Sequence, residues 1–389
     1  MRGDRSHVGS ALLRRINERR LIEALQRHGP ASRAALTRVS GLTAPTVSKA
    51  VDALLRHGLV EELEPPTPAI GRPGRLVRMA AESATVLGAV IDVDVCAVAA
   101  AGLDGAVADD RMRRFTTPAD YAMLLDALAD HCRAVIAAVG GVVRGVGVSV
   151  PGLVNGRLCE VVCSPNLHAI DGRNPARDLE ARLHAPCVLL QEADALVLGE
   201  RQATAARGLD DFAVLDATRG LGLGAMSGGQ LLAGHGGMAG EIGHITVDPS
   251  GARCGCGNQG CLETLATDTA LARLIGERVG RPVTIDEASA LLAAGTTDFR
   301  GEVRTVTEYL AIAIAAVVNI FNPAALFVHN RLLAADSERF ARVLDRVRQR
   351  ALTAALAECS IVAARSGKLE GAVAGIIHHL TTAWGPTVR

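Results

Sequence analysis

The sequence predicts an α/β protein that carries a small, mostly helical domain at its N-terminus. Three observations predict this fold class. From residue 84 onward, strand-like apolar runs alternate with helical ones, as in α/β proteins. Before residue 80, short helical stretches are separated by glycine and proline breaks. The charge divides in the same way: residues 1–80 hold fourteen Lys or Arg and seven Asp or Glu, whereas the rest holds twenty-seven and thirty-four. A basic head is typical of a nucleic-acid-binding protein, although a merely solvated surface has the same charge.

The composition is that of a globular chain with a core of Ala, Val and Leu, because 49% of the 389 residues are hydrophobic and only 2% are aromatic. The best apolar run, Tyr309 to Phe321, is shorter than the ~18 residues needed to span a bilayer. The arginine-rich N-terminus lacks the apolar stretch of a signal peptide. Nine cysteines, an odd number, do not indicate a disulfide framework. We therefore expect a cytoplasmic protein without a membrane partner.

The first eighty residues contain three helical stretches. The first, over 15–28, has its apolar residues mostly at helical spacing and ends at a Gly-Pro pair. Ser32 is a suitable N-cap for a short helix over 33–39, and a glycine turn follows it. Thr43 can cap a third helix over 44–57. Two short helices around a glycine turn predict a helix-turn-helix.

The third helix is expected to enter the DNA. Its apolar stripe, which includes Val47, Val51 and Leu54, should face inward, so the small polar residues at its start face outward. A proline in the first turn of a helix is tolerated. The DNA-binding residues predicted on this helix are Thr43, Pro45, Thr46, Ser48 and Lys49.

Two strand-like runs, 59–63 and 75–79, flank a proline-rich tip and make the helix-turn-helix a winged one. The wing and linker at 65–75 end in the sequence GRPGR. An extended Arg-Pro segment is thin enough to enter a minor groove, where arginine is favoured electrostatically. Arg72 and Arg75 are therefore predicted to bind DNA. A basic hinge between domains remains the alternative for the tip, and a protein-interaction winged helix remains the alternative for the head.

The body follows the α/β pattern in order. The body begins at residue 84 with a strand, a tight turn and a second strand. These are followed by a helix, a buried strand, a strand leading into a helix, a glycine-rich hairpin and a long helix. The long helix ends at Asn322-Pro323. No internal repeat of 20–50 residues is visible.

Several motifs in the body follow one another in a recognisable order. They are SVPGLV (149–154), SPNL (164–167), QEADALVLGE (191–200), GLGLG (220–224), and GEIGH (240–244) followed by CGCGNQGCLE (254–263). Over nearly the whole chain this order resembles the ROK family of repressors, open reading frames and sugar kinases. The winged head and the GRPGR tip point to the transcriptional-regulator branch.

The resemblance implies a fold and a division into domains. The body is expected to be actin-like (ribonuclease H-like), with the two α/β subdomains of sugar kinases and a ligand cleft between them. The winged head would occupy 1–80 and the ROK effector domain 81–389. Subdomain one would span about 81–190 plus the C-terminal helix, and subdomain two about 191–369.

The loop at 241–263 predicts a metal site. One histidine and three cysteines, His244, Cys254, Cys256 and Cys261, suit a tetrahedral Zn²⁺ with no position left open. Four protein ligands argue for a structural zinc ion, and the spacing matches the zinc site of the family. A redox-active or simply buried thiol cluster is the alternative.

The resemblance also implies a sugar site beside the metal. Glu241 and Glu263 match carboxylates that accept hydrogen bonds from sugar hydroxyls, and His244 is expected to serve both zinc and sugar. Asn166 in SPNL matches an amide that contacts the sugar. Glu192 stands where the kinases of the family have a catalytic aspartate. Carboxylates and amides suit carbohydrates, because each hydroxyl can donate and accept.

The parts that a kinase needs depart from the family pattern. The phosphate loop Asp-x-Gly-Gly-Thr is here Asp92-Val93-Asp94-Val95-Cys96, which lacks both glycines. The Gly-Gly-Gly of the adenosine site is replaced by a stretch that begins at His329. Phosphoryl transfer depends on positioning and charge neutralisation, so we expect these changes to abolish it.

We therefore expect a sugar-responsive DNA-binding regulator, a repressor of carbohydrate-metabolism genes whose effector binds in the interdomain cleft. It would act as a homodimer or homotetramer on an inverted-repeat DNA operator. The alternative is an ATP-dependent sugar kinase of the hexokinase type, which would be bifunctional if it also binds DNA.

Overall fold

The computed structural model describes residues 4–64, 75–140, 142–203, 206–334 and 336–382. The chain forms two compact units. The first consists of Met1–Pro151, Ala169–Gln202 and Lys368–Arg389, and the second of Gly152–His168 and Ala203–Gly367. This division differs from the predicted boundary near residue 190. The strand β10 (Cys187–Gln191) runs straight into α6 (Glu192–Ala203), so nearly all of α6 stays with the first unit.

The N-terminal domain is a winged helix-turn-helix, as the sequence predicts. The side chain of Ser32 accepts a hydrogen bond from the amide of Ala35 and so caps the second helix, and Gly41 makes the following turn with a φ of 67°. The three strands form a sheet in the order β1-β3-β2. The elements are α1 (Asp4–His28), β1 (Ala31–Ser32), α2 (Arg33–Ser40), α3 (Ala44–Arg56), β2 (Val60–Leu63) and β3 (Leu76–Met79).

Three details of this domain go beyond or against the prediction. Helix α1 begins at Asp4 and not near residue 15; residues 11–15 are exposed, so apolar spacing did not mark them as helical. Thr43 occupies the N-cap position of α3 but makes no capping bond, because its hydroxyl lies 2.8 Å from that of Thr46. The wing tip at 65–74, which includes Arg72, lies outside the described residues.

The winged domain shares its hydrophobic core with the sheet that follows it in the first unit. Leu21, Ile22 and Leu25 of α1 lie in one buried cluster with Val86 of the next sheet and with Ile377 of α13 (Lys368–Thr382). The backbone amide of Leu103 in the body also donates to the carbonyl of Ala80. The head is therefore packed against the body of its own unit.

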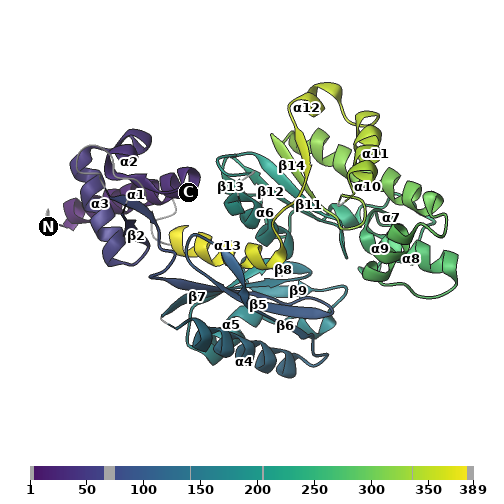
Figure 1. Cartoon of the computed structure of the whole chain (residues 1–389), viewed down its shortest axis with the longest axis horizontal. Coiled ribbons are helices and arrows are strands. Elements are labelled where there is room, and N and C mark those ends of the chain that lie inside the picture. The colour runs from purple at the N-terminus through teal and green to yellow at the C-terminus, as the bar shows by residue number, and fades with distance from the viewer. Residues whose placement is uncertain (1–3, 65–74, 141, 204–205, 335, 383–389) are drawn as a thin grey trace. The chain divides into compact units, whose positions relative to one another are not determined.

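The body of the first unit is a five-stranded sheet in the order β10-β7-β4-β5-β6. Strands β4, β7 and β10 are parallel, and β5 and β6 are antiparallel to their neighbours. Helices α4 (Tyr121–Val139) and α5 (Pro175–Leu183) cover one face, and α13 covers the other (Figure 1). The remaining strands are β4 (Thr85–Val90), β5 (Val95–Ala101), β6 (Val107–Thr116) and β7 (Val143–Val150).

The second unit is built on another five-stranded sheet, in the order β13-β12-β11-β14-β15. Its strands are β11 (Phe212–Asp216), β12 (Gly222–Ser227), β13 (Gln230–Leu231), β14 (Ala325–His329) and β15 (Ser360–Ala363). A small hairpin joins β8 (Leu153–Asn155) to β9 (Glu160–Cys163). The α-helices are α7 (Glu263–Ala266), α8 (Asp268–Val279), α9 (Ile285–Ala294), α10 (Arg300–Phe321), α11 (Ser337–Arg348) and α12 (Thr353–Ala357).

Helix α10 is a core helix. By length and composition it is the one helix among the described residues that could cross a membrane, and half of its apolar window is buried. Val306, Leu310 and Ile314 are fully buried and pack in the main core cluster of the second unit. Its apolar character is therefore explained by packing.

Candidate zinc centre, effector residues and DNA interface

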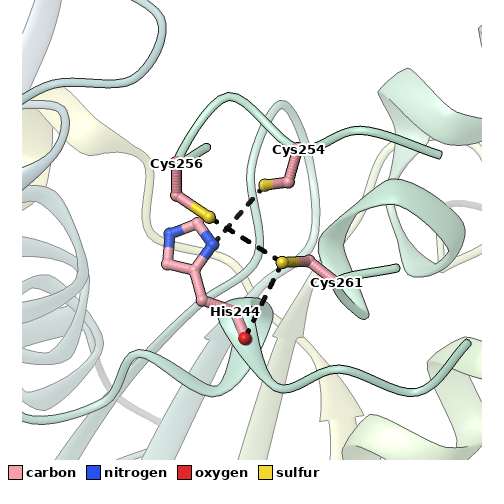
Figure 2. Close-up of side chains that lie close together, drawn as sticks. All are labelled: His244, Cys254, Cys256 and Cys261. Atoms are coloured by element: carbon pink, nitrogen blue, oxygen red, sulfur yellow. Dashed lines mark hydrogen bonds between the residues drawn. The ribbon is translucent and has the colours of Figure 1, made fainter. Parts of the chain in front are cut away.

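The side chains of His244, Cys254, Cys256 and Cys261 point toward one another (Figure 2). Their four candidate ligand atoms all lie within 4.8 Å of one another. Cys256 Sγ lies 3.8 Å from Cys261 Sγ, and Cys254 Sγ lies 3.6 Å from His244 Nδ1. A tetrahedral zinc ion with Zn–S bonds of about 2.3 Å and Zn–N bonds of about 2.0 Å separates its ligands by about 3.5 to 3.8 Å. The four residues therefore suit Zn²⁺ in type, and two of their separations already have the spacing of a tetrahedral site.

The backbone of the loop brings the four ligands together. The short helix η2 (Ile242–His244) carries the histidine, and the cysteines follow in turns closed by bridges between Thr246 and Cys261 and between Arg253 and Gln259. A β-carbon on Gly260, whose φ is +72°, would lie 1.6 Å from the carbonyl oxygen of Asp248. Glycine is thus required where the chain crosses itself just before Cys261.

Glu263 supports this centre. One of its oxygens lies 3.5 Å from Cys254 Sγ, and the other accepts a hydrogen bond from the amide of Leu221. Burial raises the pKa values of the Cys254 and Cys261 thiols. Such thiols keep their protons unless a metal cation binds and displaces them. With a metal bound, Cys254 would be a thiolate and would no longer donate a hydrogen bond to Glu263.

His244 faces two ways. Its Nδ1 is turned toward Cys254, while its Nε2 lies 3.7 Å from Glu241 Oε2. Both side chains are partly exposed, His244 at 23% and Glu241 at 31%. An imidazole that binds a metal through one nitrogen keeps the other as a donor, so His244 can hold zinc and also bind a ligand beside Glu241.

Asn166 lies next to the same loop. A β-carbon on Gly255 would be 3.8 Å from Asn166 Oδ1, and Asn166 itself is exposed. The second unit therefore brings together four of the five predicted sugar residues: Asn166, Glu241, His244 and Glu263 around one zinc loop. The fifth, Glu192, belongs to the first unit.

Glu192 begins α6 and contacts a lysine that the sequence analysis did not identify. Lys368 Nζ lies 2.7 Å from Asp92 Oδ2 and also pairs with Glu192 Oε1. Asp92 follows β4, Glu192 follows β10 and Lys368 starts α13, so three distant segments meet at the carboxyl edge of the parallel strands. Only the folded chain brings these segments together, so neither spacing nor motif could reveal the contact.

The other positions that differ from the kinase pattern also carry ionisable side chains. Asp94 is exposed in the turn after β4. In the second unit, His329 Nδ1 lies 3.3 Å from Asp216 Oδ1, at the ends of the parallel strands β14 and β11. Burial raises the pKa of nearby Asp268 to about 7, although the amides of Arg331 and Leu332 donate to it.

The predicted DNA surface on α3 is partly exposed. Thr43, Pro45 and Lys49 are exposed, whereas Thr46 and Ser48 are half-buried. Ser48 Oγ accepts a hydrogen bond from Arg33 Nη1 at 2.9 Å. Ser48 is therefore already engaged within the domain, whereas Thr43, Pro45 and Lys49 are exposed.

Arg33 is a residue that the sequence analysis missed. Its guanidinium joins Ser48 and Asp52 of α3 to Glu62 of β2. Glu62 in turn pairs with Arg75 at 3.3 Å, and the hydrogen bond from Arg33 lowers the pKa of Glu62. The wing and the recognition helix are thus linked by a chain of ion pairs. Its only sequence signal was a lone arginine after the Ser32 cap.

Comparisons with known proteins agree with this architecture. Residues 88–379 match the model of the ROK family, and residues 13–69 match that of the MarR family. A xylose repressor of Bacillus subtilis is 25% identical over 324 residues, which are 82% of this chain and 83% of the repressor.

Solved structures show the same fold. A ROK family transcriptional regulator, described as a homolog of the E. coli MLC protein, has a TM-score of 0.80 at 23% identity and covers 96% of this chain and 98% of its own. The ROK hexokinase of Thermus thermophilus has a TM-score of 0.63 at 27% identity, over 77% of this chain and 100% of its own. Because the family match spans well over half of the residues, the chain belongs to the ROK family, with a MarR-type winged helix in front of the ROK body.

Proposed function

We propose that this protein is a sugar-responsive DNA-binding transcriptional repressor that acts in the cytoplasm on genes of carbohydrate metabolism. The observation that carries the proposal is the combination of two parts in one chain. A winged helix-turn-helix presents exposed polar residues at the start of α3, and a ROK body gathers carboxylate, amide and imidazole groups around one loop. A xylose repressor is similar to this chain over 83% of its own length.

The zinc ion is proposed to be structural. Three thiolates and one imidazole leave no open coordination position for a substrate or a reactive water. When bound, the ion would fix the loop and thereby orient Glu241 and the free nitrogen of His244. Together with Asn166 and Glu263, these groups are proposed to bind the hydroxyls of the effector sugar. Glu192 is proposed as a further effector contact.

We propose that sugar kinase activity has been lost. In the first unit, Lys368 pairs with both Asp92 and Glu192, so an ammonium neutralises the position that matches the catalytic base. Asp94 adds a carboxylate where phosphate would approach, and like charges repel at such distances. The similarity to the Thermus hexokinase keeps an ATP-dependent sugar kinase as the second candidate.

The DNA-binding form is proposed to be a homodimer or homotetramer on an inverted repeat. Two α3 helices would then enter successive major grooves, with half-sites one or more helical turns apart. Arg72 and Arg75 are proposed to add contacts from the wing. Arg75 is 63% exposed, and its present partners are Glu62 and Glu64.

Two assays on the full chain test the proposed function. In a thermal-shift panel of D-xylose, D-glucose, N-acetyl-D-glucosamine and common disaccharides, at least one sugar should raise the melting temperature, because a ligand that binds only the folded state stabilises it. A coupled ATP-consumption assay with the same sugars should show no turnover. Sugar-dependent ATP turnover would instead favour the kinase. A matched Glu192→Gln variant shows whether any turnover belongs to this site.

A further inference from the structure

Helix α13 connects two places in the first unit that serve different parts of the proposed function. At its first residue, Lys368 pairs with Asp92 and Glu192. Two turns further on, Ile376 and Ile377 are buried in the same cluster as Leu21, Ile22 and Leu25 of the winged domain. With a rise of about 1.5 Å per residue, the two places are about 12 to 14 Å apart along the helix axis.

Lys368 stands where a cation is unfavourable. The first turn of a helix carries the positive end of the helix dipole, which favours carboxylates and disfavours ammonium groups. The whole sequence has only two lysines, Lys49 and Lys368, among 41 basic residues. The side chains of Lys368, Asp92 and Glu192 are only 15%, 20% and 21% exposed, so water screens them weakly. The two carboxylates are therefore what holds the ammonium at this helix end.

The body of α13 is packed so closely that it cannot deform locally. A β-carbon on Gly147 of β7 would lie 1.9 Å from the carbonyl oxygen of Ala372, and one on Gly371 would lie 2.5 Å from that of Ala195 in α6. Backbone thus meets backbone on two sides of the helix. Close-packed interiors transmit displacements instead of absorbing them. A helix packed in this way is suited to pass a change at Lys368 along its length toward the winged domain.

We propose that Lys368 is an effector-site residue and that α13 carries its state to the winged domain. A sugar hydroxyl that donates to Glu192 competes with the Lys368 ammonium for the same carboxylate. The ammonium then keeps Asp92 as its partner but loses Glu192, so one of the two ion pairs that fix the first residue of α13 is broken. At its other end, α13 contacts α1, against which the recognition helix α3 is packed. This inference rests on the proposed function, since it takes Glu192 as an effector contact.

The coupling can be measured without any sugar. Hydrogen exchange of the full chain should be compared between the parent, Lys368→Met, Lys368→Arg and Lys49→Met. Lys368→Met should speed exchange of the α1 amides around residues 18–25 by about tenfold, the loss expected for one charge-assisted hydrogen bond. Lys368→Arg keeps the charge and should restore most of the protection. Lys49→Met, the matched loss of the other lysine, should leave these amides unchanged. Equal exchange in Lys368→Met and the parent would overturn the coupling.

A second measurement tests whether Lys368 reads the sugar. Reductive methylation with ¹³C-formaldehyde labels the N-terminal amine and both lysines, and the Lys49→Arg and Lys368→Arg variants assign the two lysine signals. Any sugar of the panel that raises the melting temperature should shift the Lys368 signal and leave that of Lys49 in place. A stabilising sugar that leaves the Lys368 signal unmoved would overturn the role of Lys368 while the proposed function stands. If no sugar stabilises the chain, the proposed function fails, and the exchange measurement alone decides the coupling.

Discussion

Acidification from pH 7 to pH 5 should lower the free energy of unfolding of the first unit, because His378 of α13 becomes protonated more readily in the unfolded chain. This half-buried imidazole has its pKa lowered from 6.5 to about 4, first by burial and then by the positive charges of Arg201, Arg19 and His379. Because the pKa is depressed in the folded state, the unfolded chain takes up the proton first as the pH falls. The stability that depends on neutral His378 is complete above pH 6.5 and is lost between pH 6.5 and pH 4.

The size of the effect follows from these two pKa values. At pH 5, a shift from 6.5 to about 4 corresponds to a loss of about 2 kcal/mol in the free energy of unfolding. This is an upper value, because water screens part of a half-buried ring. His378 lies at the end of α13 that borders the winged domain. Its protonation should therefore weaken the packing between the winged domain and the body of the first unit.

The assay is urea unfolding of the full chain, followed by circular dichroism at pH 7 and pH 5. His378→Gln removes the titration and should lose less stability than the parent between the two pH values. His28→Gln, which changes an exposed histidine that does not act on His378, serves as the matched control and should behave like the parent. Equal losses in the parent and in His378→Gln would show that burial of His378 does not set this pH dependence.

Three further predictions concern the zinc loop and the DNA surface. Metal analysis of the purified protein should find about one zinc ion per chain. Cys256→Ser should lose this zinc, whereas Cys359→Ser, a matched change outside the loop, should keep it. Full zinc content in Cys256→Ser would contradict the assignment of the ligands. If Lys49 contacts a phosphate, Lys49→Ala should reduce the slope of log DNA affinity against log salt concentration by roughly one unit. An unchanged slope and an unchanged affinity would mean that the DNA binds elsewhere on the protein. Arg33→Ala should lower the DNA affinity because it removes the ion pair that holds the wing at Glu62, while the slope of log affinity against log salt concentration should change little. A slope reduced by about one unit would mean that Arg33 itself contacts a phosphate.

Most of the fold could be predicted from the sequence because its elements bury one face. The strands β4, β7 and β10 and the long helix α10 are apolar runs bounded by breaks, and the winged domain has a glycine turn between its two short helices. Edge strand β6 was missed for the opposite reason. Seven of its ten residues are exposed and several are charged, so the strand shows no apolar alternation.

The metal ligands could be predicted because they lie close together in sequence. His244 and the three cysteines fall within eighteen residues, and the glycines between them show that the backbone must turn tightly. Lys368 could not be found in this way. Its partners Asp92 and Glu192 lie far away in the chain, and only the parallel strand order brings them to one edge. Arg33 and Glu62 were missed for the same reason.

The central claim, that a sugar bound by the ROK body controls DNA binding by the winged head, is tested most directly by one affinity measurement. DNA duplexes bound by the full chain are first selected from a random library. The affinity for the best duplex is then measured by fluorescence anisotropy at fixed salt, with and without each sugar that raises the melting temperature. At least one such sugar should weaken DNA binding by about five- to 150-fold, the usual range of coupling between two sites. DNA affinity that stays the same with every stabilising sugar would contradict it.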